Sequence, residues 1–145
     1  MTIWFDMDGT IADLYSVEGW LENLVNEDVR PYREAKPLLN FSSFAKILKN
    51  IQRKGYAIGV LTWGSKNASD NYNSQVMETK RAWLKKHLPS VEWDNFQFMP
   101  YGTCKNLANA GNDVLFDDEE KNRQDWQGMA YEPQQISEIL KNLCQ

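Results

Sequence analysis

Short, continuously apolar segments alternate along the chain with longer segments whose apolar residues recur at helical spacing. The strand-like segments are TIWFD at 2–6, YAIGVLT at 56–62, NFQFM at 95–99, DVLF at 113–116 and a weaker GMAY at 128–131. Continuously apolar strands are typical of a parallel sheet that is buried on both faces. The pattern therefore predicts an α/β fold, a three-layer Rossmann-like parallel sheet of about five strands.

Four helices are expected from the helical spacing. They run through residues 14–25, 44–51, 77–88 and 136–143, and the last begins near Pro133. For the second helix, Ser42 or Ser43 is the expected N-cap and Gly55 the stop. Polar residues 63–74 are expected to form a loop that leads into the third helix.

A small insertion is expected after the first strand. The charged stretch 26–40 contains Pro31 and Pro37, which interrupt helices, so it predicts a loop or a small lid. The chain is thus expected to be one domain, residues 1–145, with a minimal cap or lid at about 14–40.

Composition agrees with a single globular domain, because 42% of the 145 residues are hydrophobic and 25% are charged. No apolar run approaches the ~20 residues of a membrane span, and the N-terminus lacks the basic region of a secretory signal. We therefore expect a cytoplasmic protein without a membrane partner. The formal charge of −4 opposes nucleic-acid binding. Cys104 and Cys144 indicate reduced thiols, and His87, the only histidine, is expected at a helix C-terminus. Whether the protein forms a homo-oligomer is left open by the sequence.

Polar side chains gather where the predicted strands end. Asp6 and Asp8 follow the first strand, Thr62 ends the second, and Asp117 and Asp118 follow the fourth. The carboxyl ends of parallel strands meet at one edge, where α/β proteins bind ligands. Four carboxylates that converge there repel one another unless a divalent cation lies among them. Ligands that are all oxygen, with no suitably placed His or Cys, favour Mg²⁺ as the cofactor.

Such a cluster suits phosphoryl transfer. A bound cation can bridge protein carboxylate and substrate phosphate. One carboxylate can attack phosphorus directly, and a second carboxyl two residues later can protonate the leaving oxygen and then activate water. The Thr62 hydroxyl is a further donor, and a lysine is still needed to balance the phosphate charge.

The segments DMDGT, an apolar strand ending in Thr62, a lysine and LFDD, in this order, resemble the four motifs of the haloacid dehalogenase (HAD) superfamily of phosphohydrolases. They extend from Asp6 to Asp118, over most of the chain. The resemblance implies that Asp6 is the nucleophile and a metal ligand. It makes Asp8 the general acid and base, with a backbone carbonyl that also reaches the metal. It assigns phosphoryl binding to Thr62, and it makes Asp117 a metal ligand and Asp118 a second ligand or an orienter.

Two lysines compete for the third motif. Lys105 lies twelve positions before Asp117, at the start of a short helix, which is similar to the 5′(3′)-deoxyribonucleotidase subgroup. Lys80 is the competitor, but the neighbouring charges in its helix (Arg81, Lys85 and Lys86) indicate a solvated face. Lys105 is therefore favoured for the phosphate, while Lys66, in the loop after Thr62, is an alternative contact to the substrate.

Substrate choice is the part that the motifs leave open. The insertion is shorter than the cap of the deoxyribonucleotidases, so the cleft is either open or closed by a partner subunit. Tyr15, Trp20 and Tyr32 are interpreted as base-stacking residues or as core and lid packing, and Trp63 as a pocket wall.

The leading interpretation is a Mg²⁺-dependent phosphomonoesterase that acts on a small phosphorylated metabolite, with a nucleoside monophosphate as the best single guess. The alternatives are a nucleic-acid end phosphatase and a non-catalytic HAD-like binding or regulatory protein. No GxxxxGK[ST] segment is present, which argues against a P-loop nucleotide hydrolase. In a response-regulator receiver the motifs follow one another in a different order, which argues against that class as well.

Overall fold

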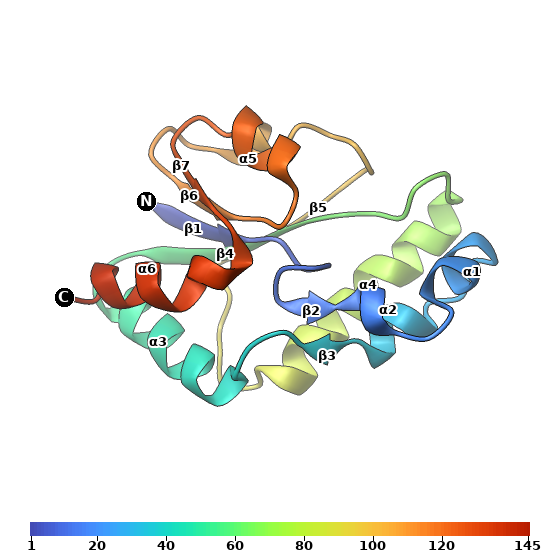
Figure 1. Cartoon of the computed structure of the whole chain (residues 1–145), viewed down its shortest axis with the longest axis horizontal. Helices are drawn as coiled ribbons and strands as arrows, with labels where there is room; N and C mark the ends of the chain where they lie inside the picture. Colours follow the sequence, from blue (N-terminus) through green and yellow to red (C-terminus); the bar gives the residue numbers. More distant parts are fainter.

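A five-stranded parallel sheet forms the centre of the computed structural model, which describes residues 1–145 (Figure 1). Its strands stand in the order β5 (Asn95–Met99), β4 (Ala57–Trp63), β1 (Thr2–Phe5), β6 (Val114–Phe116) and β7 (Met129–Tyr131). Every neighbouring pair is parallel. Helices lie on both faces, so the predicted three-layer, Rossmann-like α/β fold is confirmed.

The chain changes direction across the sheet between β5 and β6. It first builds outward from β1 to β4 and β5, and then crosses back to add β6 and β7 on the other side of β1. In the sheet, the point where the strand order reverses therefore lies between β1 and β6, which are direct neighbours. A crevice at the carboxyl ends of such strands is the usual ligand site of open α/β sheets.

The two faces of the sheet are covered unequally. Helices α3 (Phe41–Arg53), α4 (Asp70–His87) and α6 (Ile136–Leu143) form the larger core with Phe5 and its same-face neighbours. On the other face, the short helices η2 (Lys105–Ala108) and α5 (Glu120–Asp125) lie over a small cluster made by Trp4, Leu61, Leu115 and Trp126. We call this thinner cover the η2–α5 layer. Figure 1 shows α3 and α6 on one side of the strands and α5 on the other.

The insertion between β1 and α3 contains more structure than the sequence pattern predicts. It consists of β2 (Ala12–Asp13), η1 (Leu14–Ser16), α1 (Trp20–Val25), α2 (Arg30–Glu34) and β3 (Lys36–Pro37), with β2 and β3 paired antiparallel. We call residues 12–37 the lid. It packs on the first half of α4 through a cluster that includes Leu14, Tyr32, Tyr72 and Val76.

A single helix over residues 14–25 was the wrong expectation. Gly19 adopts a left-handed conformation with φ +69°, which divides the segment into η1 and α1. Leu21 and Val25, expected on a buried face, are 59% and 74% exposed. Likewise, Pro31 does not prevent α2, because it stands in the first turn, where proline is tolerated.

Other helix ends differ from the expected ones by a few residues. The N-cap of α3 is Asn40, whose Oδ1 accepts from the Ser43 backbone N–H at 3.0 Å, rather than Ser42 or Ser43. Helix α4 begins at Asp70, inside the expected loop, with Ser69 as its N-cap. As predicted, His87 ends α4, and Gly55 follows α3 with φ +96°. Both cysteines are free thiols, and none of the helices has the length and apolarity needed to cross a membrane.

Candidate functional site

The acidic residues that follow β1 and β6 meet at the carboxyl edge of the sheet. Side-chain alternation places Asp6 on the same face as Trp4 and Asp117 on the same face as Leu115, toward the η2–α5 layer. There Lys105 of η2 donates to Asp6 Oδ1 at 2.8 Å and to Asp117 Oδ2 at 2.7 Å. Burial alone would lower the pKa of Lys105, but these two carboxylates outweigh it and raise that pKa above its usual value. The favoured lysine therefore does reach the cluster.

The turn after β1 links the Asp118 carboxylate to Asp6. The Thr10 hydroxyl lies 2.9 Å from Asp6 Oδ2 and 3.3 Å from Asp118 Oδ1, and it accepts from the Asp118 backbone N–H at 3.1 Å. Gly9 has φ +82°, and a Cβ at this position would collide with the Asp118 carboxylate. A glycine is thus required for the turn to approach Asp118 so closely. Thr10 is a member of the site that was not singled out from the sequence.

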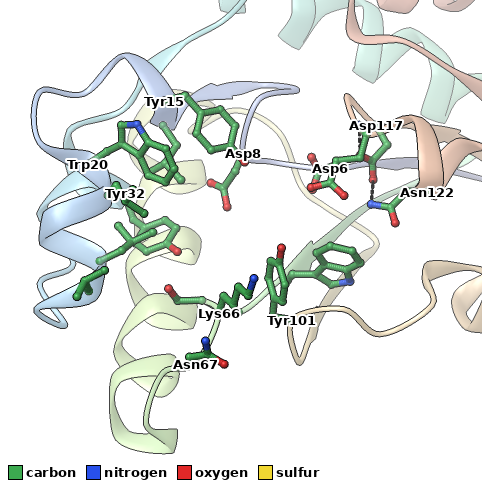
Figure 2. A pocket seen from close by; sticks show the side chains of 18 of the residues that line it. Asp6, Asp8, Tyr15, Trp20, Tyr32, Lys66, Asn67, Tyr101, Asp117 and Asn122 are labelled. Carbon is green, nitrogen blue, oxygen red and sulfur yellow. Dashed lines mark hydrogen bonds between the residues drawn. The ribbon is translucent and has the colours of Figure 1, made fainter.

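Helix α5, which sequence analysis did not predict, holds Asp117 in place. Asn122 donates through Nδ2 to Asp117 Oδ2 at 3.1 Å, and the Glu119 backbone N–H donates to Asp117 Oδ1 at 2.9 Å. Arg123 adds a bond from Nη1 to the Asp117 backbone carbonyl at 3.0 Å. Figure 2 shows Asn122 beside Asp117. No apolar periodicity marks residues 120–125, so the only signal for Asn122 was its position shortly after the paired aspartates.

Three carboxylates of this cluster suit a divalent cation. One oxygen each from Asp6, Asp117 and Asp118 lies within 4.8 Å of the other two. Mg²⁺ binds oxygen ligands at about 2.0–2.1 Å, so its ligand atoms stand about 3–4 Å apart and small side-chain adjustments are sufficient. Burial and the nearby Asp6 carboxylate raise the pKa of Asp117 and of Asp118, the latter to about 8. These raised values mark a crowded negative cluster, and the donor set therefore fits Mg²⁺.

The Asp8 carboxylate lies outside that cluster and has its own lysine. Lys80 of α4 donates to Asp8 Oδ2 at 2.8 Å, to Thr62 Oγ1 at 2.7 Å and to the Trp63 carbonyl at 2.9 Å. Burial raises the pKa of Asp8, although Lys80 acts in the opposite direction. The expected backbone contact from Asp8 to a metal stays a prediction.

The expectation that Lys80 lies on a solvated face was wrong. Its side chain is only 1% exposed. Residues Tyr72, Val76, Lys80 and Trp83 follow one another at intervals of four, four and three positions, and all are buried. This stripe faces the sheet and the lid. The charges next to Lys80 in sequence concealed a lysine that shares the helix face of the apolar residues.

A cavity of about 530 Å³ opens above the carboxylates. Asp6, Asp8, Lys105 and Asp117 line its acidic end, whereas Thr62 and Asp118 are not among the lining residues. Thr62 is completely buried and meets Lys80, so its predicted contact with a phosphoryl group is not direct in this conformation. Five of the seven predicted site residues therefore face one cavity, including Trp63.

Aromatic side chains form much of the remaining wall, together with aliphatic side chains of the lid. Tyr15 and Trp20 of the lid stand edge to face with ring centres 4.9 Å apart, and Trp63 and Tyr101 do the same at 5.1 Å. In Figure 2, Tyr15, Trp20 and Tyr32 lie on one side of Asp8, while Asp6, Asp117 and Asn122 lie on the other. Lys66 also lines the cavity, with Nζ 5.8 Å from the Tyr101 ring centre. Tyr32 serves lid packing as well, because it is buried in the lid cluster.

No protein-family model matches the chain, and no curated protein matches it either. The geometry of the site is therefore the guide to its chemistry. That geometry contains a carboxylate cluster suited to a hard cation, two buried lysines that hold different carboxylates, and a cavity with polar and aromatic ends.

The carboxylate cluster should make stability depend on pH in a defined direction. A carboxyl whose folded-state pKa is raised contributes most at low pH, and that contribution is lost as pH rises toward the folded value. For Asp118 this pH window extends from the ordinary aspartate pKa of 3.8 to its raised pKa of about 8. We expect Asp118→Asn to raise the melting temperature of the metal-free protein by a few degrees at pH 8 and by less at pH 5. For a chain of this length, 1 kcal/mol of stability corresponds to about 3 °C.

Thermal unfolding with EDTA and with Mg²⁺ checks this prediction. Mg²⁺ should stabilise the wild type more at pH 8 than at pH 5, because it binds only the ionised carboxylates. Its stabilising effect should be smaller in Asp118→Asn. Identical pH profiles for the two proteins in EDTA would show that the Asp118 carboxylate is not under electrostatic strain.

Proposed function

We propose that the chain is a Mg²⁺-dependent phosphomonoesterase of the HAD superfamily that works through a phosphorylated Asp6. The observation that carries the proposal is the pair of carboxylates Asp6 and Asp8, which line one cavity while each is held by a different buried lysine. Two carboxyl groups in different environments suit two different roles, nucleophile and proton donor. The motif order in the sequence supports the same assignment.

In the first step, an Asp6 carboxylate oxygen bonds to phosphorus. The bond from phosphorus to the alcohol oxygen breaks, its electron pair stays on that oxygen, and Asp8 supplies the proton that completes the alcohol. Lys105 lines the cavity between Asp6 and Asp117, so its charge reduces the repulsion between the nucleophile and the phosphate.

In the second step, a water oxygen bonds to phosphorus while Asp8, now a carboxylate, takes the proton of that water. The bond between phosphorus and the Asp6 oxygen breaks, which releases inorganic phosphate and restores the Asp6 carboxylate. When bound by Asp6, Asp117 and Asp118, Mg²⁺ supplies positive charge that neutralises the phosphoryl oxygens.

The aromatic walls support a substrate with a planar ring, and we propose a nucleoside monophosphate. Tyr15, Trp20, Trp63 and Tyr101 present ring surface a short distance from the carboxylates. Ring packing adds about 0.5–1.5 kcal/mol for each aromatic pair beyond the buried area. Lys66 is the only lining cation besides Lys105, so the cavity favours one phosphate group over a di- or triphosphate.

A panel of phosphomonoesters, followed by release of inorganic phosphate, tests this function. With Mg²⁺ we expect hydrolysis that falls at least about 100-fold in EDTA and returns when Mg²⁺ is added back. Nucleoside monophosphates and aryl phosphates should show a KM about tenfold lower than glycerol phosphate.

Two other results would point to the alternative functions. If Mg²⁺ supports hydrolysis of no ester in the panel, a non-catalytic binding protein is favoured. Preference for 5′-phosphorylated oligonucleotides, with binding that weakens steeply with salt, would favour a nucleic-acid end phosphatase.

A further inference from the structure

Lys80 is a buried cation to which the proposed reaction gives no direct part. We propose that Lys80 is a positioning residue for Asp8: it aims the Asp8 carboxyl group first at the leaving alcohol oxygen, to which Asp8 gives a proton, and then at the attacking water, from which Asp8 takes one. This inference rests on the proposed function and adds a second lysine with a task different from that of Lys105.

The contacts of Lys80 leave it no capacity to bind substrate. A lysine ammonium has three N–H donors. In this protein they meet Asp8 Oδ2, Thr62 Oγ1 and the Trp63 carbonyl at 2.8, 2.7 and 2.9 Å. Lys80 does not line the cavity, whereas Asp8 does. Any effect of Lys80 on chemistry must therefore act through the groups that it holds.

Two of these three contacts are to a rigid element. Thr62 and Trp63 are the last two residues of β4. Both pair with β5, and the earlier residues of β4 pair with β1 on the other side. The ammonium is thus fixed relative to the sheet, and it fixes Asp8 Oδ2 in turn. The other oxygen, Oδ1, has no hydrogen-bond partner in the protein, and the Asp8 side chain is 20% exposed. The contact therefore leaves one Asp8 oxygen free, and the Asp8 side chain lines the cavity (Figure 2).

Packing alone does not explain a lysine at this position. Its neighbours on the buried stripe of α4 are Val76 and Trp83, and the rings of Tyr32 and Phe98 lie 5.1 and 5.8 Å from Nζ. A methionine has similar length and would fill this largely apolar space without the desolvation of a charge. The ammonium is useful here because of what it orients.

Two esters that differ in whether their leaving group needs a proton can distinguish a positioning role of Lys80 from a purely structural role. Dinitrophenolate leaves without a proton, so phosphorylation of Asp6 by 2,4-dinitrophenyl phosphate does not need Asp8. An alkyl phosphate such as a nucleoside 5′-monophosphate does need it, and the hydrolysis of phosphorylated Asp6 needs Asp8 for every substrate. In Lys80→Met we therefore expect the burst of dinitrophenolate to keep its rate within about tenfold. Steady-state turnover of both esters should fall about 100-fold or more.

Three comparison variants complete the experiment. Asp8→Asn should give the same separation of burst and steady state. Lys85→Met, an exposed lysine of the same helix, should leave both rates unchanged. Lys80→Arg keeps the buried charge, so it guards against failure of the methionine variant to fold, and it should give the same separation because the planar guanidinium cannot reproduce the three contacts.

The outcomes distinguish the two proposals. If burst and steady state fall by the same factor in folded Lys80 variants, or if neither falls, Lys80 does not position Asp8 and this inference is overturned. If the wild-type protein hydrolyses neither ester, the proposed phosphatase function itself fails.

Discussion

Replacing Asp6 with asparagine is expected to abolish turnover of phosphate esters, with kcat at least about 10³-fold lower, while the protein still folds. The amide oxygen is a poor nucleophile, so no covalent bond to phosphorus forms. The fold tolerates the change because the Asn side chain has the same shape and retains an oxygen that can accept from Lys105 or Thr10. Removing one of the crowded negative charges also relieves repulsion with Asp117 and Asp118.

Phosphate release and thermal unfolding of Asp6→Asn provide the measurement. A matched control is Asp125→Asn, which removes an exposed carboxylate whose only ion pair is with Lys121, and it should keep full activity. Substantial turnover by folded Asp6→Asn would remove Asp6 from the role of nucleophile. A second check is that no phosphorylated protein is trapped by acid quenching in the variant.

Replacing Lys105 with methionine is expected to reduce both activity and stability. The ammonium is almost fully buried between Asp6 and Asp117, so its loss leaves two carboxylates facing each other without a cation. Breaking a buried ion pair by removing one partner costs about 3–5 kcal/mol. For a chain of this length that corresponds to a melting temperature lower by about 10 °C. We also expect kcat/KM to fall at least about 100-fold.

Urea denaturation of Lys105→Met in EDTA and in Mg²⁺ tests the origin of this loss. The double variant Lys105→Met/Asp117→Asn should recover part of the stability, because it removes one of the two opposed charges, but no activity. Lys121→Met, at an exposed i,i+4 pair, should change neither quantity by more than about 0.5 kcal/mol or its kinetic equivalent. A stable, fully active Lys105→Met protein would contradict the assignment of Lys105 to the phosphate site.

The sheet and the gathering of the acidic residues were predictable because both depend on local pattern and simple topology. Continuously apolar segments located β1, β4, β5, β6 and β7 within about one residue. Once the strands are parallel, residues that follow them must meet at one edge, so Asp6, Thr62 and Asp117 were expected near one another. In the structure Lys105 joins Asp6 and Asp117, whereas Thr62 belongs to the neighbouring group in which Lys80 also holds Asp8.

The parts that were not predictable depend on tertiary contacts. The lid elements are short and are stabilised mainly by packing against α4, and the left-handed Gly19 interrupts a pattern that otherwise indicates a helix. Helix α5 has the sequence EKNRQD, which carries no apolar stripe. Lys80 was misplaced because a buried charge is recognisable only once its partners, Asp8 and Thr62, are known to lie opposite it.

Because the sheet is covered unequally, the proposed catalytic centre depends on the thinner of the two layers. Lys105 and Asn122, which hold Asp117 in position, both come from the η2–α5 layer, whose helices have only four and six residues. Segments with few buried contacts open most readily while the remainder stays native. Transient fraying of these helices would therefore silence the protein long before its global melting point, so heat inactivation should precede the loss of circular dichroism.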